Sequence, residues 1–573
     1  MSSVIVEKDV DAKMRDGTIL RCDVYRPSHS GQFPVLLQRI PYSKSFPWLS
    51  ILLLNPLNAA DQGYVVVIQD CRGRFTSDGD WGPFHVEGED GYDSVEWCAR
   101  QPWSNGKVGI YGSSYMGVTT WQAVINNPPH LEAAFVRLTG TNYHDGWAYS
   151  GGAFELGFNL QWALSLGWDK LTKLPSETRR TIRQSMFEIE SDNWAAYQRL
   201  PLNDMHAYKE VAPYYFDWLA HPSYDEYWRA VNVGERYDKI TVPVLQMTGW
   251  FDNFLIGHLR SFDGITKKGA TDKARRNQKI IIGPWPHNNY MTINQSKVGD
   301  FELGHAAIPN AEALAFRWFD HWLKGVNTGI MNESPVRIFV MGANAWRDEE
   351  DWPLKRAKKI PWYLHSGGHA NTLNGDGVLT TVSPKSESPD SYTYDPADPV
   401  PTIGGRILMP EVAQDGFRDQ RSAEERSDVL VYTSPLLMKD IEVTGPLALK
   451  LWAATSAKDT DFTAKLVDVY PDGYAAIVAD GILRARYRES MAEPKLLEPG
   501  QIYELAIDLW ATSQVFKKGH HIRIEVSSSN FPRFDRNLNT GGDNASAAQV
   551  QIAFQTIYHD AERPSHIVLY VVE

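Results

Sequence analysis

Cysteine is scarce in this sequence, and so are long hydrophobic runs. The chain of 573 residues has 3 cysteines, at positions 22, 71 and 98, in no CxxC pattern. This excludes a disulfide framework and a cysteine-based metal site, and it is typical of a reducing compartment. The sequence has no run of about 18 apolar residues, and its start lacks a basic segment followed by an apolar one. We therefore expect a cytoplasmic protein that does not enter a membrane.

Blocks of like charge are also missing, and the net charge of −13 is spread along the chain. A negative surface repels phosphate backbones and anionic headgroups, so we expect neither nucleic acid nor a membrane as a partner. Hydrophobic residues make up 43% of the chain, which at this length is enough for three or four domains. The 20 tryptophans indicate dense cores or a pocket for an apolar or aromatic substrate.

An α/β pattern occupies the first part of the chain. Short apolar runs at 35–37, 65–68, 108–111 and 133–138 are typical of strands buried in a parallel sheet, with helix-length segments between them. The alternation of strands and helices is interrupted from about 143 to 239, where segments rich in Trp and Tyr favour helices. Buried strands return at 242–247 and 279–282, and 311–324 predicts a closing helix. One α/β domain is thus expected in two segments, separated by a helical cap.

Beyond about residue 355 the pattern changes to short β-rich runs separated by turns. These runs cover 429–432, 447–452, 462–469, 503–509, 522–526 and 567–572, and they favour an all-β sandwich or jelly roll. Segments 366–377 and 383–401 are rich in turn residues and predict loops or crossings between strands. The predicted units are an α/β core at 1–143 and 241–355, a helical cap at 144–240 and a β domain at 356–573.

Ser114 lies in a segment that resembles a nucleophile elbow, Gly112-Ser113-Ser114-Tyr115-Met116-Gly117. In such an elbow a tight turn from strand to helix exposes a serine hydroxyl over the end of a sheet. The usual pattern is Gly-x-Ser-x-Gly, whereas here the second glycine comes one position late. A plain strand-to-helix turn would give a similar pattern. Ser113 is a rival nucleophile, although Gly112 would then adjoin it and crowd the turn.

An acid and a base follow in the chain order that α/β-hydrolases require, which is serine, acid, histidine. Asp252 is the first acid beyond the strand at 244–247, and His287 follows the strand at 279–282. Both therefore come just past the carboxyl end of a predicted parallel strand, where side chains converge. His258 is a rival base but falls inside the helix expected after Asp252, and His305 lies in a loop. We predict Ser114, Asp252 and His287 as a catalytic triad.

Two donors are needed for an oxyanion hole. The backbone N–H of Tyr115, directly after the nucleophile, is one candidate. The second usually comes from the loop after an early strand, which here is Arg39–Lys44 and has no His-Gly-Gly-Gly run. The hydroxyl of Tyr42 could donate from this loop. The sequence is equally compatible with Tyr42 being an aromatic side chain that only packs in the loop.

Several motifs together resemble one known family. They include Gln69-Asp70-Cys71-Arg72-Gly73, the elbow, Gly249-Trp250-Phe251-Asp252, Gly283-Pro284-Trp285-Pro286-His287 and Ser528-Ser529-Asn530-Phe531-Pro532. The chain is similar, essentially from end to end, to the cocaine esterase branch of the X-Pro dipeptidyl-peptidase-like serine hydrolases. That resemblance implies a hydrolase core, a helical cap and a C-terminal jelly roll. It also implies a tyrosine after the nucleophile, the late glycine, and an oxyanion donor at Tyr42.

The resemblance further implies an acyl pocket. Its lining would come from the cap, the acid-bearing loop and the start of the β domain, at Trp147, Trp162, Phe254, Leu408 and Met409. For the two tryptophans, simple core packing is the alternative. The family position of Met409 is often aromatic, and Ser165 stands where this branch has a leucine. We therefore expect a similar but not identical pocket.

The expected activity is that of a serine carboxylesterase for small esters with an apolar or aromatic acyl group, without a metal or other cofactor. An acylase, an amidase or a dipeptidyl-peptidase is an alternative, but Asn253-Phe254-Leu255 follow Asp252 where related enzymes hold a substrate ammonium with acids. A metal hydrolase using Asp252, His258 and His287 lacks a ligand motif such as HExxH. A carbohydrate-binding or scaffolding protein with a vestigial core is a non-enzyme alternative. Free sheet edges in the β domain could support a homodimer.

Overall fold

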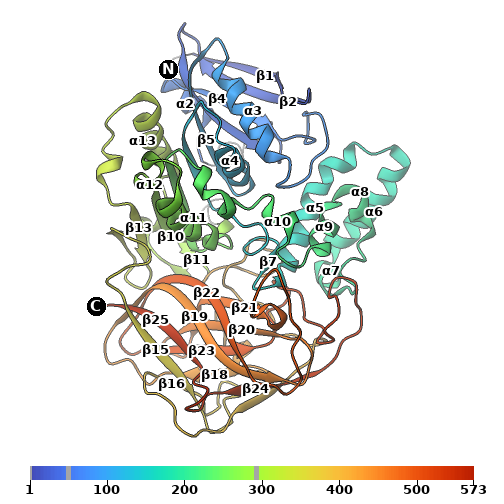
Figure 1. Ribbon diagram of the computed structural model, residues 1–573, viewed down its shortest axis with the longest axis vertical. Coiled ribbons are helices and arrows are strands. Elements are labelled where there is room, and N and C mark those ends of the chain that lie inside the picture. The colour runs from blue at the N-terminus through green and yellow to red at the C-terminus, as the bar shows by residue number, and fades with distance from the viewer. Residues whose placement is uncertain (1–2, 47–52, 289–295) are drawn as a thin grey trace.

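The computed structural model describes residues 3–46, 53–288 and 296–573. Its α/β part carries the N-terminus, a group of helices projects on one side, and a β domain lies below both (Figure 1). The observed classes are therefore the predicted ones: a mixed α/β core, helices inserted into it and a separate C-terminal β-rich domain. The boundaries at residues 143, 240 and 355 stay predictions.

A ten-stranded sheet forms the α/β core, in the order β1-β2-β4-β3-β5-β6-β9-β10-β13-β14. Neighbours from β4 to β13 run parallel, and the outer strands pair antiparallel. The bounds are β1 Val4–Lys13, β2 Ile19–Pro27, β3 Phe33–Ile40, β4 Val65–Asp70, β5 Ser104–Ser113, β6 Leu131–Arg137, β9 Val244–Phe251, β10 Lys279–Pro286, β13 Val336–Val340 and β14 Ala345–Glu349.

Helices cover both faces of this sheet. Those with side chains in the cluster on one face are α3 (Glu87–Ala99), α4 (Tyr115–Ile125) and α11 (Leu255–Lys268). Those on the other face are α2 (Pro56–Asp61) and α13 (Ala311–Lys324), the predicted closing helix. Because the central strands are apolar on both faces, they are buried only when helices cover both. The short α12 (Asp272–Arg276) precedes β10.

The cap lies between β6 and β9 in the chain. It begins with the hairpin β7 (Tyr149–Ser150) and β8 (Ala153–Phe154), followed by α5 (Leu156–Thr172). Most of α5 is buried, because it packs between the remaining cap helices and the core. The remaining elements are α6 Ser176–Ser191, α7 Asn193–Gln198, α8 His206–Val211, α9 Tyr214–Ala220, α10 Glu226–Arg229 and η1 Val233–Lys239.

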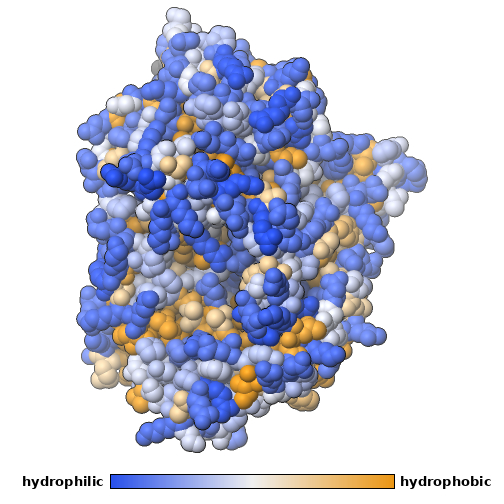
Figure 2. Space-filling view, in the orientation of Figure 1, coloured by the Kyte–Doolittle hydropathy of each residue, from blue (hydrophilic) through white to orange (hydrophobic). Residues whose placement is uncertain are grey.

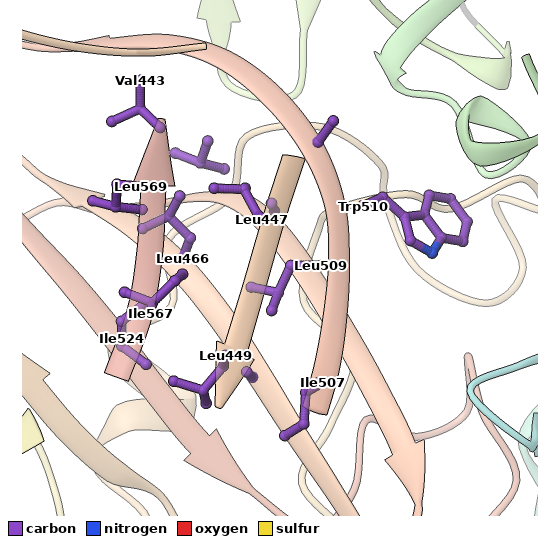
Figure 3. Packing of buried hydrophobic residues seen from close by; sticks show 14 of the residues in the cluster. Val443, Leu447, Leu449, Leu466, Ile507, Leu509, Trp510, Ile524, Ile567 and Leu569 are labelled. Atoms are coloured by element: carbon purple, nitrogen blue, oxygen red, sulfur yellow. The ribbon is translucent and has the colours of Figure 1, made fainter. Parts of the chain in front are cut away.

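The β domain is an eleven-stranded, mainly antiparallel assembly. Inward-facing apolar side chains of β19, β20, β22, β23 and β25 meet in one core, and Trp510 of β22 lies at one side of the same cluster (Figure 3). The strands are β15 Lys358–His365, β16 Val378–Thr380, β17 Asp390–Tyr394, β18 Leu430–Thr433, β19 Ile441–Thr455, β20 Asp461–Val469, β21 Ala475–Arg484, β22 Tyr503–Phe516, β23 His521–Ser527, β24 Ala553–Tyr558 and β25 His566–Val572. An all-β domain is confirmed, and its description as a jelly roll stays a prediction.

One local prediction in this domain was wrong. Segment 383–401 was expected to be a loop or a crossing, but it contains the strand β17, which pairs antiparallel with β24. Every second side chain of β17 is buried, starting with Asp390. The strand is short and begins with a buried acid, and so it lacks the apolar run by which the other strands were recognised.

The surface is largely polar. Hydrophilic side chains cover most of the visible face, and hydrophobic ones gather mainly in a band over the β domain (Figure 2). In the described ranges, no helix has both the length and the apolarity that crossing a bilayer requires.

Candidate active site

Ser114 stands at a sharp turn between β5 and α4. Its backbone has φ 56° and ψ −126°, a conformation that L-residues seldom adopt and that is typical of an exposed nucleophile. Gly112 makes this turn possible, since a Cβ on it would lie 2.1 Å from the carbonyl oxygen of Met116. The local sequence therefore fixes a strained loop that turns the Ser114 hydroxyl away from the strand.

The late glycine of the elbow also has a physical reason. A Cβ on Gly117 would lie 2.6 Å from Cβ of Thr139, just beyond β6, so this position must be glycine for α4 to approach the sheet. Met116 points its side chain into the core on the other face of the sheet. The two glycines thus have different structural roles. Gly112 allows the turn at Ser114, and Gly117 allows α4 to pack closely against the sheet.

The structure brings together the three residues predicted as a triad. Nε2 of His287 lies 3.0 Å from Oγ of Ser114, and Nδ1 of His287 lies 2.9 Å from Oδ1 of Asp252. Asp252 and His287 follow β9 and β10, as the strand pattern predicts, and their side chains are buried. This geometry allows the imidazole to accept a proton from the serine while the carboxylate holds its tautomer.

Two further donors hold Asp252 in place. Oγ1 of Thr248 donates to Oδ2 of Asp252 at 2.9 Å, and the N–H of Phe254 donates to Oδ1 at 3.2 Å. These hydrogen bonds fix the plane of the carboxylate. Sequence reasoning missed Thr248, although its position on β9 four residues before the acid is a usable signal.

None of the rivals occupies this site. Ser113 is buried, and no described residue bonds its hydroxyl. His258 is held in the core, with Nε2 accepting from the Thr139 N–H at 2.9 Å, and burial lowers its pKa to about 4. His305 is exposed in η3 (His305–Ala307). Among residues 3–46, 53–288 and 296–573, no three His, Cys, Asp or Glu side chains are grouped so that they could hold a metal ion, and the trio with His258 is not such a group.

The two predicted oxyanion donors approach from different elements. Tyr115 is the first residue of α4, where backbone N–H groups have no intrahelical acceptor and the helix dipole favours negative charge. Its hydroxyl accepts from the Phe84 N–H at 2.9 Å and donates to Oε1 of Glu87 at 3.1 Å. Tyr42, in the loop after β3, is half-buried, and its hydroxyl oxygen accepts from Nε1 of Trp162 at 3.0 Å.

A buried ion pair behind the elbow was not predicted. Glu87, which accepts from Tyr115, is fully buried, and Nη1 of Arg39 lies 2.9 Å from its Oε2. Arg39 is the penultimate residue of β3, just before the Tyr42 loop, so one pair of charges supports both the elbow and that loop. No local pattern reveals it, because its two members lie 48 positions apart.

The predicted pocket residues form one aromatic cluster next to the triad. Phe254 stacks on Trp147 with centroids 4.1 Å apart and meets the His287 ring edge-on at 5.2 Å. Trp147 and Trp162 lie 5.4 Å apart, and Leu408 and Met409 pack against the same cluster. Ser165 is exposed on α5. The structure therefore places all five predicted pocket residues together.

Leu408 and Met409 reach the site on a segment of the β domain that is tied to the triad strands. The Leu408 carbonyl accepts from the side chain of Asn288, which follows His287. Nearby, the guanidinium of Arg406 donates to the carbonyls of Trp250 at 3.1 Å and Ala511 at 3.0 Å. Burial lowers the pKa of Arg406 to about 10, so it stays charged at neutral pH. The β domain thus anchors the end of β9, two residues before Asp252.

Comparison with known proteins gives consistent matches. Residues 16–289 match the X-Pro dipeptidyl-peptidase (S15) family, and residues 328–568 match the C-terminal non-catalytic domain of X-Pro dipeptidyl-peptidases. Cocaine esterase of Rhodococcus sp. (strain MB1 Bresler) is 40% identical over 582 residues, covering 99% of each chain.

Solved structures agree along the whole chain. An aminopeptidase from a marine sediment Thaumarchaeota archaeon has a TM-score of 0.84 at 26% identity, covering 100% of this chain and 96% of its own. An α-amino acid ester hydrolase has a TM-score of 0.79 at 25% identity, with 100% and 97% covered.

Proposed function

Because the chain is a serine hydrolase of the X-Pro dipeptidyl-peptidase (S15) family, we propose that it cleaves small carboxylic esters with an apolar or aromatic acyl group. The observation that carries this proposal is the continuous line from Ser114 Oγ through His287 to Asp252, with contacts of 3.0 and 2.9 Å. The aromatic cluster beside it offers apolar surface to an acyl group.

Catalysis would proceed through an acyl-enzyme. Oγ of Ser114 attacks the ester carbonyl while Nε2 of His287 takes its proton and then gives it to the leaving alcohol. Asp252 holds the other imidazole nitrogen and stabilises the imidazolium. The Tyr115 N–H and the Tyr42 hydroxyl bind the tetrahedral oxyanion. Water activated by His287 then releases the acid and restores the Ser114 hydroxyl.

The residues after Asp252 favour an ester over a substrate with a free amine. Asn253 and Phe254 follow the acid, and Phe254 packs on Trp147 and His287. A substrate ammonium would therefore meet an aromatic ring at this place and would lose its hydration without an anionic partner.

Amide hydrolysis is the second candidate, because a solved aminopeptidase superposes on the whole chain. Acylase, amidase and dipeptidyl-peptidase activities use the same triad, so they differ from an esterase in what the pocket binds. The small-molecule ester as partner, a homodimer and a cytoplasmic location are parts of the same proposal.

Two measurements test it. We expect one phosphonofluoridate label per chain in the wild type and none in Ser114→Ala, which would distinguish a working hydrolase from a vestigial one. A panel of p-nitrophenyl and benzoyl esters, with matched amides, aminoacyl-proline substrates and β-lactams, then measures kcat/KM. The ester proposal is wrong if an amide or a peptide is cleaved faster than every ester.

Tyr42→Phe tests the oxyanion hole. Removing one donor should lower kcat about 10²- to 10³-fold with an activated ester. Unchanged turnover would remove Tyr42 from the mechanism and leave the triad in place.

A further inference from the structure

One hydrogen bond joins the predicted acyl pocket to the predicted oxyanion hole. Nε1 of Trp162, on the cap helix α5, lies 3.0 Å from the hydroxyl oxygen of Tyr42, in the loop after β3. The direction of this bond is fixed, because an indole nitrogen can only donate. The tyrosine oxygen is therefore the acceptor, and the phenolic hydrogen must point along another direction.

The ring of Trp162 has little freedom to turn. It stacks on Trp218 with an interplanar angle of 10° and centroids 5.7 Å apart, and it contacts Trp147, Phe158 and Tyr115 at 5.4, 5.8 and 5.5 Å. Its side chain is nearly fully buried. Rings on several sides thus set the direction in which its N–H points.

Trp147 provides a contrast within the same cluster. Its ring is as deeply buried as that of Trp162, but among the described residues its indole N–H has no acceptor. Packing alone therefore leaves an indole N–H unsatisfied here, and the bond from Trp162 to Tyr42 is a specific feature of one ring.

A buried arginine fixes the segments of Tyr42 and Trp162 relative to each other. Nε of Arg74 donates to the carbonyl of Pro41, next to Tyr42, at 2.8 Å. Nη1 of the same guanidinium donates to the carbonyl of Leu166 at 3.1 Å, one turn after Trp162 on α5. One side chain thus ties the backbone of the oxyanion loop to the backbone of the cap helix.

We propose that Trp162 is a positioning residue for the oxyanion donor Tyr42, so that the cap controls the rate of the reaction as well as the fit of the acyl group. This inference rests on the proposed role of Tyr42. Accepting a hydrogen bond polarises the phenol O–H and makes it a better donor, because linked hydrogen bonds strengthen one another. An acyl group that displaces the Trp162 ring would therefore slow catalysis even when it binds well.

A double-mutant cycle tests this proposal. The variants are Trp162→Phe, Tyr42→Phe and the double variant, with kcat and KM measured for p-nitrophenyl acetate and p-nitrophenyl benzoate. Trp162→Phe should lower kcat about 3- to 15-fold for both esters, because one hydrogen bond to the donor is lost. In the Tyr42→Phe background the same change should alter kcat less than twofold, since the donor is then already absent.

Trp147→Phe is the matched control. It removes the same atoms from a neighbouring buried ring without removing a hydrogen bond to Tyr42. We expect it to change mainly KM for the benzoate. Any effect of it on kcat should be independent of Tyr42→Phe, so that the two effects multiply in the double variant.

The outcomes separate the possible failures. If Tyr42→Phe lowers kcat but Trp162→Phe does not, or if their effects multiply, the positioning role is wrong and the proposed function stands. If Tyr42→Phe itself changes nothing, both the oxyanion role and the positioning role fall. Should Trp162→Phe not fold, 3-benzothienylalanine at position 162 repeats the cycle, because it keeps the double ring and replaces only the N–H by sulfur.

Discussion

In the described part of the chain, a serine, a histidine and an aspartate meet at the candidate active site and again in the β domain. In the candidate active site His287 lies between Asp252 and Ser114. In the β domain Nε2 of His559 lies 2.9 Å from Oδ2 of Asp390 and 3.2 Å from the hydroxyl of Ser366. A search by residue type alone would report both.

What differs is the number of described carboxylates that are hydrogen-bonded to the imidazole. His287 is bonded to Asp252 on Nδ1, whereas His559 is bonded to Asp390 on Nε2 and also to Glu387 on Nδ1 at 3.1 Å. Burial alone would lower the pKa of His559, but the hydrogen bonds and charges of these two acids raise it. The hydroxyl of Ser366 donates to Asp390 at 2.7 Å instead of to the histidine.

A base must be neutral before it can take a proton, so two acids that raise the pKa of a histidine make it less able to activate a serine. Asp390 and His559 stand at the start of β17 and just after β24, which pair with each other. The second group therefore joins loops of the β domain, and it offers an internal control for the first.

The largest expected difference concerns the two serines. Ser114→Ala should lower kcat for p-nitrophenyl esters about 10⁵-fold or more, because the nucleophile is lost. Ser366→Ala, made in parallel, should leave kcat within about twofold, since Ser366 takes no part in the triad geometry. Loss of activity in both variants would mean that the β-domain group has a catalytic role.

The two aspartates should differ almost as much. Asp252→Asn keeps the shape of the side chain but presents the wrong tautomer of His287 to Ser114, so kcat should fall about 10⁴-fold. Asp390→Asn should leave kcat nearly unchanged and lower the midpoint of urea unfolding. The assignment fails if Asp252→Asn retains more than about a tenth of wild-type kcat.

His559 should make stability depend on pH in a defined direction. Its folded pKa is raised, so its contribution is fully present below the unfolded value of about 6.5 and is lost as pH rises through the folded pKa. His559→Gln should therefore cost about 3 kcal/mol of unfolding free energy at pH 6 and less at pH 9. Urea unfolding at the two pH values measures this.

The control for that experiment is His369→Gln. His369 is exposed in the same loop region, and its substitution should have little effect at either pH. A cost for His559→Gln that is equal at pH 6 and pH 9 would show that His559 is neutral in the folded protein.

The smallest differences concern the hydroxyls that hold each acid. Thr248→Val removes a donor to Asp252 and should lower kcat about 3- to 10-fold. Tyr432→Phe removes the corresponding donor to Asp390 at 2.8 Å, and it should cost about 1 kcal/mol of stability with kcat unchanged. Kinetics and urea unfolding on both variants separate the two effects.

The sequence was most informative where the relevant physics is local. Gly112 and Gly117 flank the nucleophile within one turn, and Asp252 and His287 each follow an apolar strand. Parallel strands in one sheet end at the same edge. The meeting of the three side chains could therefore be predicted from the position of each residue just after a strand.

Contacts between distant segments could not be predicted in this way. The Trp162–Tyr42 bond spans 120 positions, and the contact of Arg74 with Leu166 spans 92. Nothing in the local pattern distinguishes Trp162 from Trp147, because only the fold decides which indole meets an acceptor. The strands β13 and β14 were also missed, because β14 is a mostly polar edge strand and Arg337 interrupts the apolar residues of β13.

The Arg406 anchor makes the catalytic core and the β domain hard to exchange separately. A chimaera that joined this hydrolase core to another β domain would leave the Trp250 carbonyl without its donor and would withdraw the support beneath the acid's strand. Grafting should therefore succeed only when the Arg406–Met409 segment is kept together with the core, so a recombination junction must not separate the two.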